Sequence, residues 1–504
     1  MNPDAADRPS RAPAWLAAAL VAACLILNLI WEGGATPSFG GFDEANHLGR
    51  IWAFAEQEMG RAQDVELNQP LHWPPTVHEG AAKLWLLTER SHIALKIAWT
   101  LMLAIILVAV YFLATDLTDS WGGLAAVTLA ATAPPVATYS RAVTLDMPLA
   151  MMTALTLFAL VRSRGFRHLG YSVAFGLAAG VSCLAKGYAP AYWMAPAAIA
   201  FFAHGSFVDL NKRGYENPLF NLAVGSVFGA LMMSWWYGGR LAQWLQTLTG
   251  HVQSYQQSGA LDGAWPLGRM IYGDMGPLLP AILVAGLVLG WPARRTQRSV
   301  YEIMAALLIP AALFAVAPTT YARFLMPALG AGVVLFVVGL WRLPFPTARR
   351  WVVGVLAALS LLLHVALALA PTRAADALGM FARPPQSDPQ AVALAECAAT
   401  VGPVVIVDDA WHPYLPAGML AFLVRRADGE VHITAADTER DDEAAVVAAI
   451  RDIDVAGSLL VLREGSGLPF DESVLRPFTL KREAAWRFGA RQPRLQCWIR
   501  SDAE

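Results

Sequence analysis

Long apolar runs separated by short polar connections dominate the chain up to residue 371. A membrane-crossing helix needs roughly 17 to 25 mainly apolar residues, and about eleven stretches of the sequence meet that length. We therefore expect a polytopic α-helical membrane protein with about 11 transmembrane helices. The expected spans are 14–31, 94–114, 121–138, 147–163, 170–185, 188–205, 218–238, 276–292, 300–317, 324–341 and 351–370.

The basic residues of the short connections predict the orientation. Cytoplasmic loops of membrane proteins carry an excess of Lys and Arg. Arg164, Arg213, Arg295 and Arg349 all fall on one side of the membrane if the amino terminus is cytoplasmic. Because the expected number of spans is odd, the tail that begins at residue 372 is then expected on the outer side.

Two connections of the transmembrane domain 1–371 are long enough to have structure of their own: the external connection 32–93, and the stretch 239–273, which we expect to lie along the membrane interface. The tail 372–504 is expected to form a separate small domain. In the tail, apolar runs of strand length alternate with helix-like segments, a pattern typical of an α/β domain. The expected strands are 404–407, 431–434, 459–462 and 495–499, and the expected helices are 417–426 and 442–453.

The composition agrees with a membrane protein and excludes one class of partner. The sequence is 56% hydrophobic and only 15% charged, which is unusual for a soluble protein. Its net charge is -2, and it has no basic patch of the size that nucleic-acid binding requires. Cys397 and Cys497 both lie in the expected outer tail, where an oxidising compartment would favour a disulfide between them.

An acidic pair, Asp43 and Glu44, follows the first span at the start of the external connection. A carboxylate beside the bilayer can take a proton from an acceptor hydroxyl or amine while the membrane presents a lipid-borne substrate. Taken alone, the pair is also typical of a solvated loop.

Several cations and one further carboxylate lie at the outer ends of the expected spans. Arg141, Asp146, Lys186 and Arg323 all fall on the same side as Asp43. Ionisable residues at membrane depth are costly and tend to pair or to line a polar cavity. The set therefore suits an anionic substrate at the outer interface. The alternative for each cation is interfacial anchoring, with the charged head among the lipid headgroups.

Five short motifs in this order resemble the successive signatures of the GT-C glycosyltransferases. The most similar branch contains the protein O-mannosyltransferases and the lipid A aminoarabinose transferases. The resemblance runs from about residue 14 to about residue 340. The motifs are Asp43-Glu44, Pro74-Pro75, Thr144-Leu145-Asp146-Met147-Pro148-Leu149, Lys186-Gly187 and Arg323-Phe324-Leu325-Met326-Pro327-Ala328-Leu329.

The resemblance implies an inverting hexosyl- or pentosyltransferase. Such an enzyme would move a sugar from a polyprenyl-phosphate-sugar donor to a lipid, glycan or protein acceptor. It would lie in the bacterial cytoplasmic (inner) membrane, with the active site and the tail on the periplasmic side. Asp43 matches the residue proposed as catalytic base in the family, and Glu44 would support it or contact a substrate. Asp146 matches the acidic residue of the third-connection motif, with a substrate-binding or structural role.

The same resemblance assigns the phosphate contacts. Lys186 and Arg323 would hold the donor phosphate. Apart from the resemblance, His72 and His78 could also contact a phosphate. No cofactor is implied with certainty. A divalent metal held by His72 and His78 with Asp43 or Glu44 stays an alternative.

The sequence departs from the family pattern at the acceptor side, and this leaves the acceptor open. Asn46 and His47 stand where an Arg or Tyr often follows the acidic pair, and Thr76-Val77-His78 replaces the usual aromatic residues after the prolines. The competing hypothesis is a transporter or flippase for a lipid-linked or anionic substrate, because polar residues at span ends also suit alternating access. The crowding of charges at the outer boundary, away from the midplane, favours the transferase.

Overall fold

The computed structural model divides the chain into two compact units. The first comprises Met1–Trp31, Glu66–Val77 and Lys96–Pro384, and the second comprises Glu32–Val65, His78–Leu95 and Pro385–Glu504. The predicted domain boundary between residues 371 and 372 stays a prediction. The residues that the structure describes are 11–34, 38–39, 42–60, 74–89, 91–243, 278–295, 297–315, 322–369, 386–387, 397, 404–408, 431–437, 458–463, 478–485 and 494–500.

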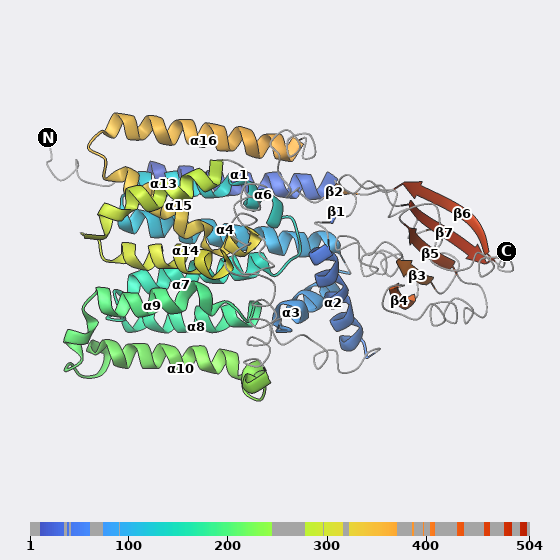
Figure 1. The fold of residues 1–504 in the computed structure, drawn as a ribbon, viewed down its shortest axis with the longest axis horizontal. Coiled ribbons are helices and arrows are strands. Elements are labelled where there is room, and N and C mark those ends of the chain that lie inside the picture. Colours follow the sequence, from blue (N-terminus) through green and yellow to red (C-terminus); the bar gives the residue numbers. More distant parts are fainter. Residues whose placement is uncertain are drawn as a thin grey trace. The chain divides into compact units, whose positions relative to one another are not determined.

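Apolar helices make up most of the first unit, and several of them run side by side in Figure 1. Every expected span overlaps one of these helices, which confirms the polytopic helical class. The helices are α1 (Ala12–Gly34), α4 (His92–Leu117), α5 (Ser120–Ala131), α6 (Pro134–Tyr139), α7 (Asp146–Ser163), α8 (Leu169–Ala185), α9 (Pro190–Ala203), α10 (Pro218–Tyr237), α13 (Leu278–Gly290), α14 (Ser299–Ala315), α15 (Met326–Trp341) and α16 (Pro346–Leu369).

Not all of these helices have the length of a full crossing. Among the described residues, 4 helices are long and apolar enough to span a membrane: Ala12–Leu29, Ile93–Leu117, Pro218–Tyr237 and Pro346–Ala366. Several other apolar helices have only 10–17 residues. The number of crossings therefore stays a prediction.

One expected span, 121–138, is divided into two helices. Helix α5 ends before Thr132, and α6 begins at Pro134. Ala133 is extended, with φ -64° and ψ 134°, because the ring of a following proline disfavours the helical conformation of the residue before it. Proline has no N–H to donate, so it is well suited to the first position of the next helix.

Helices α8 and α10 pack through glycines. A Cβ atom on Gly176 would lie 1.8 Å from the carbonyl oxygen of Gly225, and one on Gly180 would lie 2.5 Å from that of Gly229. Both helices therefore carry glycines four residues apart at the contact. Small residues at this spacing let membrane helices approach closely enough for their backbones to touch.

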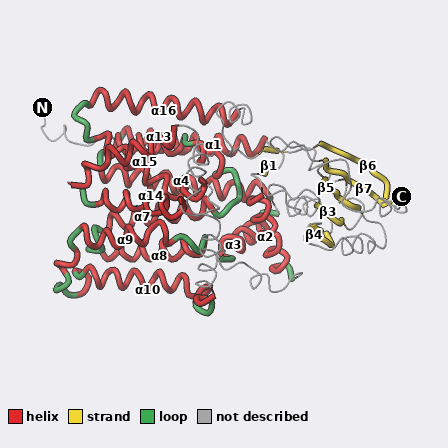
Figure 2. Tube along the Cα trace, in the orientation of Figure 1, coloured by secondary structure: helices red, strands yellow, loops and turns green. Residues whose placement is uncertain are grey.

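In the second unit, the tail contains a mixed sheet of 5 strands in the order β4-β3-β5-β7-β6 (Figure 2). Strand β3 is parallel to β4 and β5, whereas β7 is antiparallel to β5 and β6. All the expected strands are present, and β6 was not expected. The expected helices lie outside the described residues, so the α/β class of the tail stays a prediction. The strands are β3 (Val404–Asp408), β4 (Val431–Asp437), β5 (Ser458–Arg463), β6 (Phe478–Ala485) and β7 (Arg494–Arg500).

The start of the tail pairs with a strand of the external connection, and two cysteines of the tail lie close together. Strand β1 (Ser38–Phe39) pairs antiparallel with β2 (Gln386–Ser387), which joins the external connection to the start of the tail. The Sγ atoms of Cys397 and Cys497 lie 3.5 Å apart, whereas a disulfide requires about 2.05 Å. The disulfide between them stays a prediction.

Candidate functional site

Asp146 and Lys186 form a buried ion pair in the first unit. Lys186 Nζ lies 2.5 Å from Asp146 Oδ1, and the two side chains are 6% and 3% exposed. Asp146 is the first residue of α7, and Lys186 is the C-cap of α8. A helix N-terminus stabilises a carboxylate and a helix C-terminus stabilises a cation, so each helix end favours the charge placed on it.

Aromatic rings surround the Lys186 ammonium. Lys186 Nζ lies 5.4 Å from the centre of the Tyr188 ring and 5.8 Å from that of Phe324. The Phe314 ring packs against Phe324 at 5.2 Å, and the Tyr192 hydroxyl donates a hydrogen bond to the Phe324 carbonyl. These contacts bring the 3-10 helix η6 (Ala322–Leu325), which contains Arg323, next to Lys186.

The loop that leads into Asp146 is held by α1. Arg141 Nε donates a hydrogen bond to Asn28 Oδ1 at 3.0 Å, and Asn28 Nδ2 donates to Ser140 Oγ at 2.9 Å. All of these side chains are buried. One amide of α1 thus binds two consecutive residues of the loop.

Side chains of helix α4 hold the same loop through hydrogen bonds to the backbone carbonyl groups of the loop. Lys96 donates a hydrogen bond to the Arg141 carbonyl, and Trp99 Nε1 donates to the Thr144 carbonyl at 2.7 Å. Lys96 and Trp99 are three positions apart and therefore share one face of α4. Sequence patterns could not reveal that α1 and α4 fix the position of Asp146, because the residues that these helices hold are more than 40 positions away along the chain.

In the second unit, the acidic pair begins a helix. Asp43 and Glu44 are the second and third residues of α2 (Phe42–Glu58). Glu44 is fully buried, which excludes a solvated loop for this carboxylate. The side chain of Asp43 lies outside the described residues. Negative charge is favoured in the first turn of a helix, so α2 provides a suitable position for both carboxylates.

Helix α2 packs on α3 (Thr76–Leu87) through a histidine pair. His47 Nδ1 and His78 Nε2 share a hydrogen bond of 2.9 Å, and both rings are buried. Trp52 of α2 meets Trp85 of α3 edge to face at 5.2 Å. His47 is not among the predicted site residues, although its spacing of one helical turn after Glu44 is a sequence signal that places both on one face of α2.

The pKa of His78 is far below its ordinary value. Burial, and then the positive charge of Arg50, lower the pKa of His78 to about 3. The imidazole is therefore neutral at physiological pH. Within the described residues, His78 Nδ1 has no hydrogen-bond partner. The expected contact between His78 and a phosphate stays a prediction, and in this structure the ring binds His47.

The predicted site residues fall into two groups, one in each unit. Asp146 and Lys186 are paired, and the backbone of Arg323 lies beside them in η6, although its side chain is outside the described residues. Glu44 and His78 lie in the second unit. Among the described residues, no three His, Cys, Asp or Glu side chains form a metal site. The metal alternative stays a prediction, because His72 is not described.

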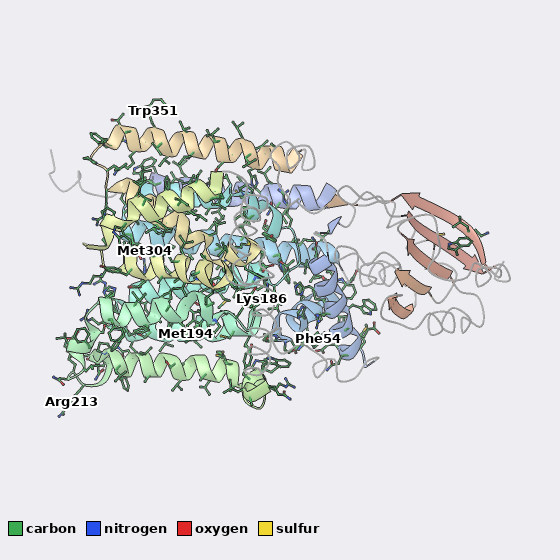
Figure 3. The ribbon with its side chains drawn as sticks, viewed as in Figure 1. Phe54, Lys186, Met194, Arg213, Met304 and Trp351 are labelled. Carbon is green, nitrogen blue, oxygen red and sulfur yellow. The ribbon has the colours of Figure 1, made fainter. Side chains whose placement is uncertain are left out.

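The opposite end of the helices carries cations that bind carboxylates. Arg162 Nε and Nη2 donate to the two carboxylate oxygens of Asp116 at 2.7 and 2.9 Å, and Arg167 pairs with Asp209 at 2.7 Å. Figure 3 shows Lys186 and Arg213 toward opposite ends of the first unit. Both ends thus carry ion pairs, and the pair at the Lys186 end is the more deeply buried. Which end is cytoplasmic stays a prediction.

Comparison with protein families identifies one segment. Residues 74–237 match the family model described as dolichyl-phosphate-mannose-protein mannosyltransferase. This segment begins at the proline motif and ends with α10, so it contains the Asp146–Lys186 pair. A search of curated proteins finds no match.

Solved structures with similar folds cover nearly the whole chain. ArnT from Cupriavidus metallidurans in the apo state is 15% identical, with a TM-score of 0.59 over 97% of this chain and 98% of that one. The same protein bound to undecaprenyl phosphate is 16% identical, with a TM-score of 0.58 over 95% and 97%. The arabinofuranosyltransferase AftD from Mycobacteria is 15% identical, with a TM-score of 0.52 over 97% of this chain and 40% of that one.

Proposed function

The chain has the fold of the GT-C membrane glycosyltransferases, and on this premise we propose that it is a polyprenyl-phosphate-sugar-dependent glycosyltransferase. It transfers the sugar, with inversion, to a lipid, glycan or protein acceptor at the external face of the cytoplasmic membrane. The fold and the match over residues 74–237 support glycosyl transfer in general. One similar structure, ArnT, is bound to undecaprenyl phosphate, which favours a lipid phosphate as the donor.

The observation that carries the proposal is the position of Lys186. Its ammonium lies at the end of α8, beside the short helix that contains Arg323, and the side chain is almost completely buried. When the bond between the anomeric carbon and the donor oxygen breaks, its electron pair moves to the phosphate. Fixed cations stabilise that developing charge more strongly than the charge of the bound donor.

Asp43 is the proposed base. The acceptor attacks the anomeric carbon from the face opposite the phosphate, and its proton passes to the Asp43 carboxylate. This direct displacement inverts the anomeric centre and needs no covalent intermediate. Glu44 supports Asp43 or contacts a substrate, and the hydrogen bond between His47 and His78 holds α2 against α3. Asp146 orients Lys186.

The test is transfer by the purified full chain in lipid vesicles supplied with a panel of polyprenyl-phosphate-sugars. Asp43→Asn keeps the shape of the side chain and removes the base, and we expect transfer to fall by about 100-fold or more. Lys186→Ala is expected to slow transfer by removing roughly 2 to 4 kcal/mol of charge stabilisation. Lys212→Ala, an exposed lysine paired with Asp209, is the control.

Two results would contradict the proposal. Transfer by Asp43→Asn within a few fold of the wild type would exclude Asp43 as the base. Movement of the lipid-linked sugar from one leaflet of the vesicle membrane to the other, with no new glycosidic bond in any acceptor, would favour the transporter or flippase hypothesis.

A further inference from the structure

The charge of Lys186 is already neutralised in this structure. Its ammonium is 2.5 Å from the Asp146 carboxylate, and both side chains are almost completely buried. A phosphate that approached this ion pair would find no net positive charge, and it would also lie close to the Asp146 carboxylate. Since like charges repel strongly where water is scarce, the phosphate and Asp146 compete for the same ammonium.

A hydrogen-bond donor lies beside the pair. The Tyr188 residue is partly exposed, but its hydroxyl oxygen is buried and has no hydrogen-bond partner among the described residues. The ring of Tyr188 is 5.4 Å from Lys186 Nζ. Buried hydroxyl groups nearly always have a partner, so the Tyr188 hydroxyl is available to donate a hydrogen bond to a ligand oxygen that binds next to Lys186.

We propose that Asp146 is an exchangeable counter-ion for the donor phosphate. In this structure it holds Lys186, and when the lipid donor binds, Lys186 moves from Asp146 to a phosphate oxygen while the Tyr188 hydroxyl donates to another. The Asp146 carboxylate keeps the favourable field at the N-terminus of α7. This inference rests on the proposed function and assigns Asp146 and Tyr188 to its donor site.

The exchange predicts opposite effects of one substitution on stability and on affinity. Asp146→Asn leaves the buried Lys186 ammonium without its counter-ion, so the empty protein should unfold at a lower temperature. The same change removes the competitor for Lys186, so a lipid phosphate should bind about tenfold more tightly. If Asp146 served only to orient Lys186, replacing Asp146 would weaken the binding of the lipid phosphate.

Tyr188→Phe tests the second contact. The substitution removes only a hydroxyl that has no protein partner, so the fold is expected to keep its thermal stability. A hydrogen bond to a charged group is strong enough that affinity for the lipid phosphate should fall by about tenfold.

The experiment titrates the purified full chain with undecaprenyl phosphate and records the shift of the unfolding temperature. Undecaprenol reports the contribution of the lipid chain alone, and inorganic phosphate reports that of a free anion. Asp116→Asn is the matched control, because it breaks an ion pair with Arg162 that is not part of this site. Asp146→Ser is a second neutral variant should Asp146→Asn not fold, since Ser is compatible with a helix N-terminus.

The expected result is tighter binding by the Asp146 variants, weaker binding by Tyr188→Phe and unchanged binding by Asp116→Asn. Unchanged or weaker binding by both Asp146 variants would overturn the exchange, and unchanged binding by Tyr188→Phe would remove Tyr188 from the site. In either case the proposed function stands if the wild type binds undecaprenyl phosphate and transfers sugar. A wild type that does neither refutes both.

Discussion

Individual side chains show where sequence patterns are informative about this protein and where they are not. The sequence predicts four charged site residues because ionisable side chains near a membrane are costly and tend to have a function. They are Asp43, Glu44, Asp146 and Lys186. Their partners could not be selected in the same way. Asp146 and Lys186 are 40 positions apart, and only the packing of α7 and α8 brings them together.

The buried His78 predicts a pH dependence of stability. The pKa of His78 is about 3 in the folded chain and roughly 6.5 when unfolded. Between these values the unfolded chain binds the extra proton, so stability is complete above the unfolded pKa and falls as the pH drops below it. From pH 7 to pH 5 the loss should be about 2 kcal/mol.

Hydrogen exchange of α2 and α3, corrected for the intrinsic rate, measures this loss. His78→Gln should remove it, because an amide does not titrate in this range, whereas the exposed His168→Gln should leave it unchanged. If the stability measured by hydrogen exchange changed equally with pH in the wild type and in His78→Gln, then His78 would not be neutral in the folded protein.

At the scale of elements, the length of apolar runs predicted the helices, and local composition explains the exceptions. The sequence contained the reason for the division of 121–138, since Pro134 and Pro135 begin α6 only two residues after the end of α5. Strand β6 was missed because Lys481, Arg482 and Glu483 interrupt its apolar pattern. It lies at the edge of the sheet, where charged residues are tolerated and discourage pairing with other chains.

The contact of α8 with α10 predicts a difference between two glycines of the same helix. A methyl group on Gly176 would collide with the Gly225 carbonyl oxygen, whereas one on Gly170 meets nothing within 4 Å. Gly176→Ala should therefore force the helices apart and destabilise the protein by about 1 to 3 kcal/mol. Gly170→Ala should be neutral or slightly stabilising, because Ala favours a helix over Gly.

The unfolding temperatures of the two variants, measured in the same detergent, test this prediction. Similar unfolding temperatures for Gly176→Ala and Gly170→Ala would show that α8 and α10 do not need the glycine contact.

At the scale of the whole molecule, hydropathy predicted the class, and the similar structures share its fold over nearly the full length. The pairing of β1 with β2 could not be predicted, because strands of two residues carry no pattern. It matters for function, since β1 directly precedes α2 and its acidic pair. The tail thus joins the segment that leads to the proposed base, and we expect it to shape access of the acceptor.

This arrangement predicts the topology. If lipid-linked sugar is used at the outer face, Asp43, Lys186 and the tail must share one compartment, and Arg213 must lie in the other, as the excess of basic residues indicates. In a chain without its native cysteines, a single cysteine at position 430 should react with an impermeant thiol reagent in intact cells. One at position 213 should react only after the membrane is permeabilised. The reverse pattern would place the tail in the cytoplasm, and with it the acidic pair that β1 and β2 connect to the tail. The proposed use of the donor at the external face would then be wrong.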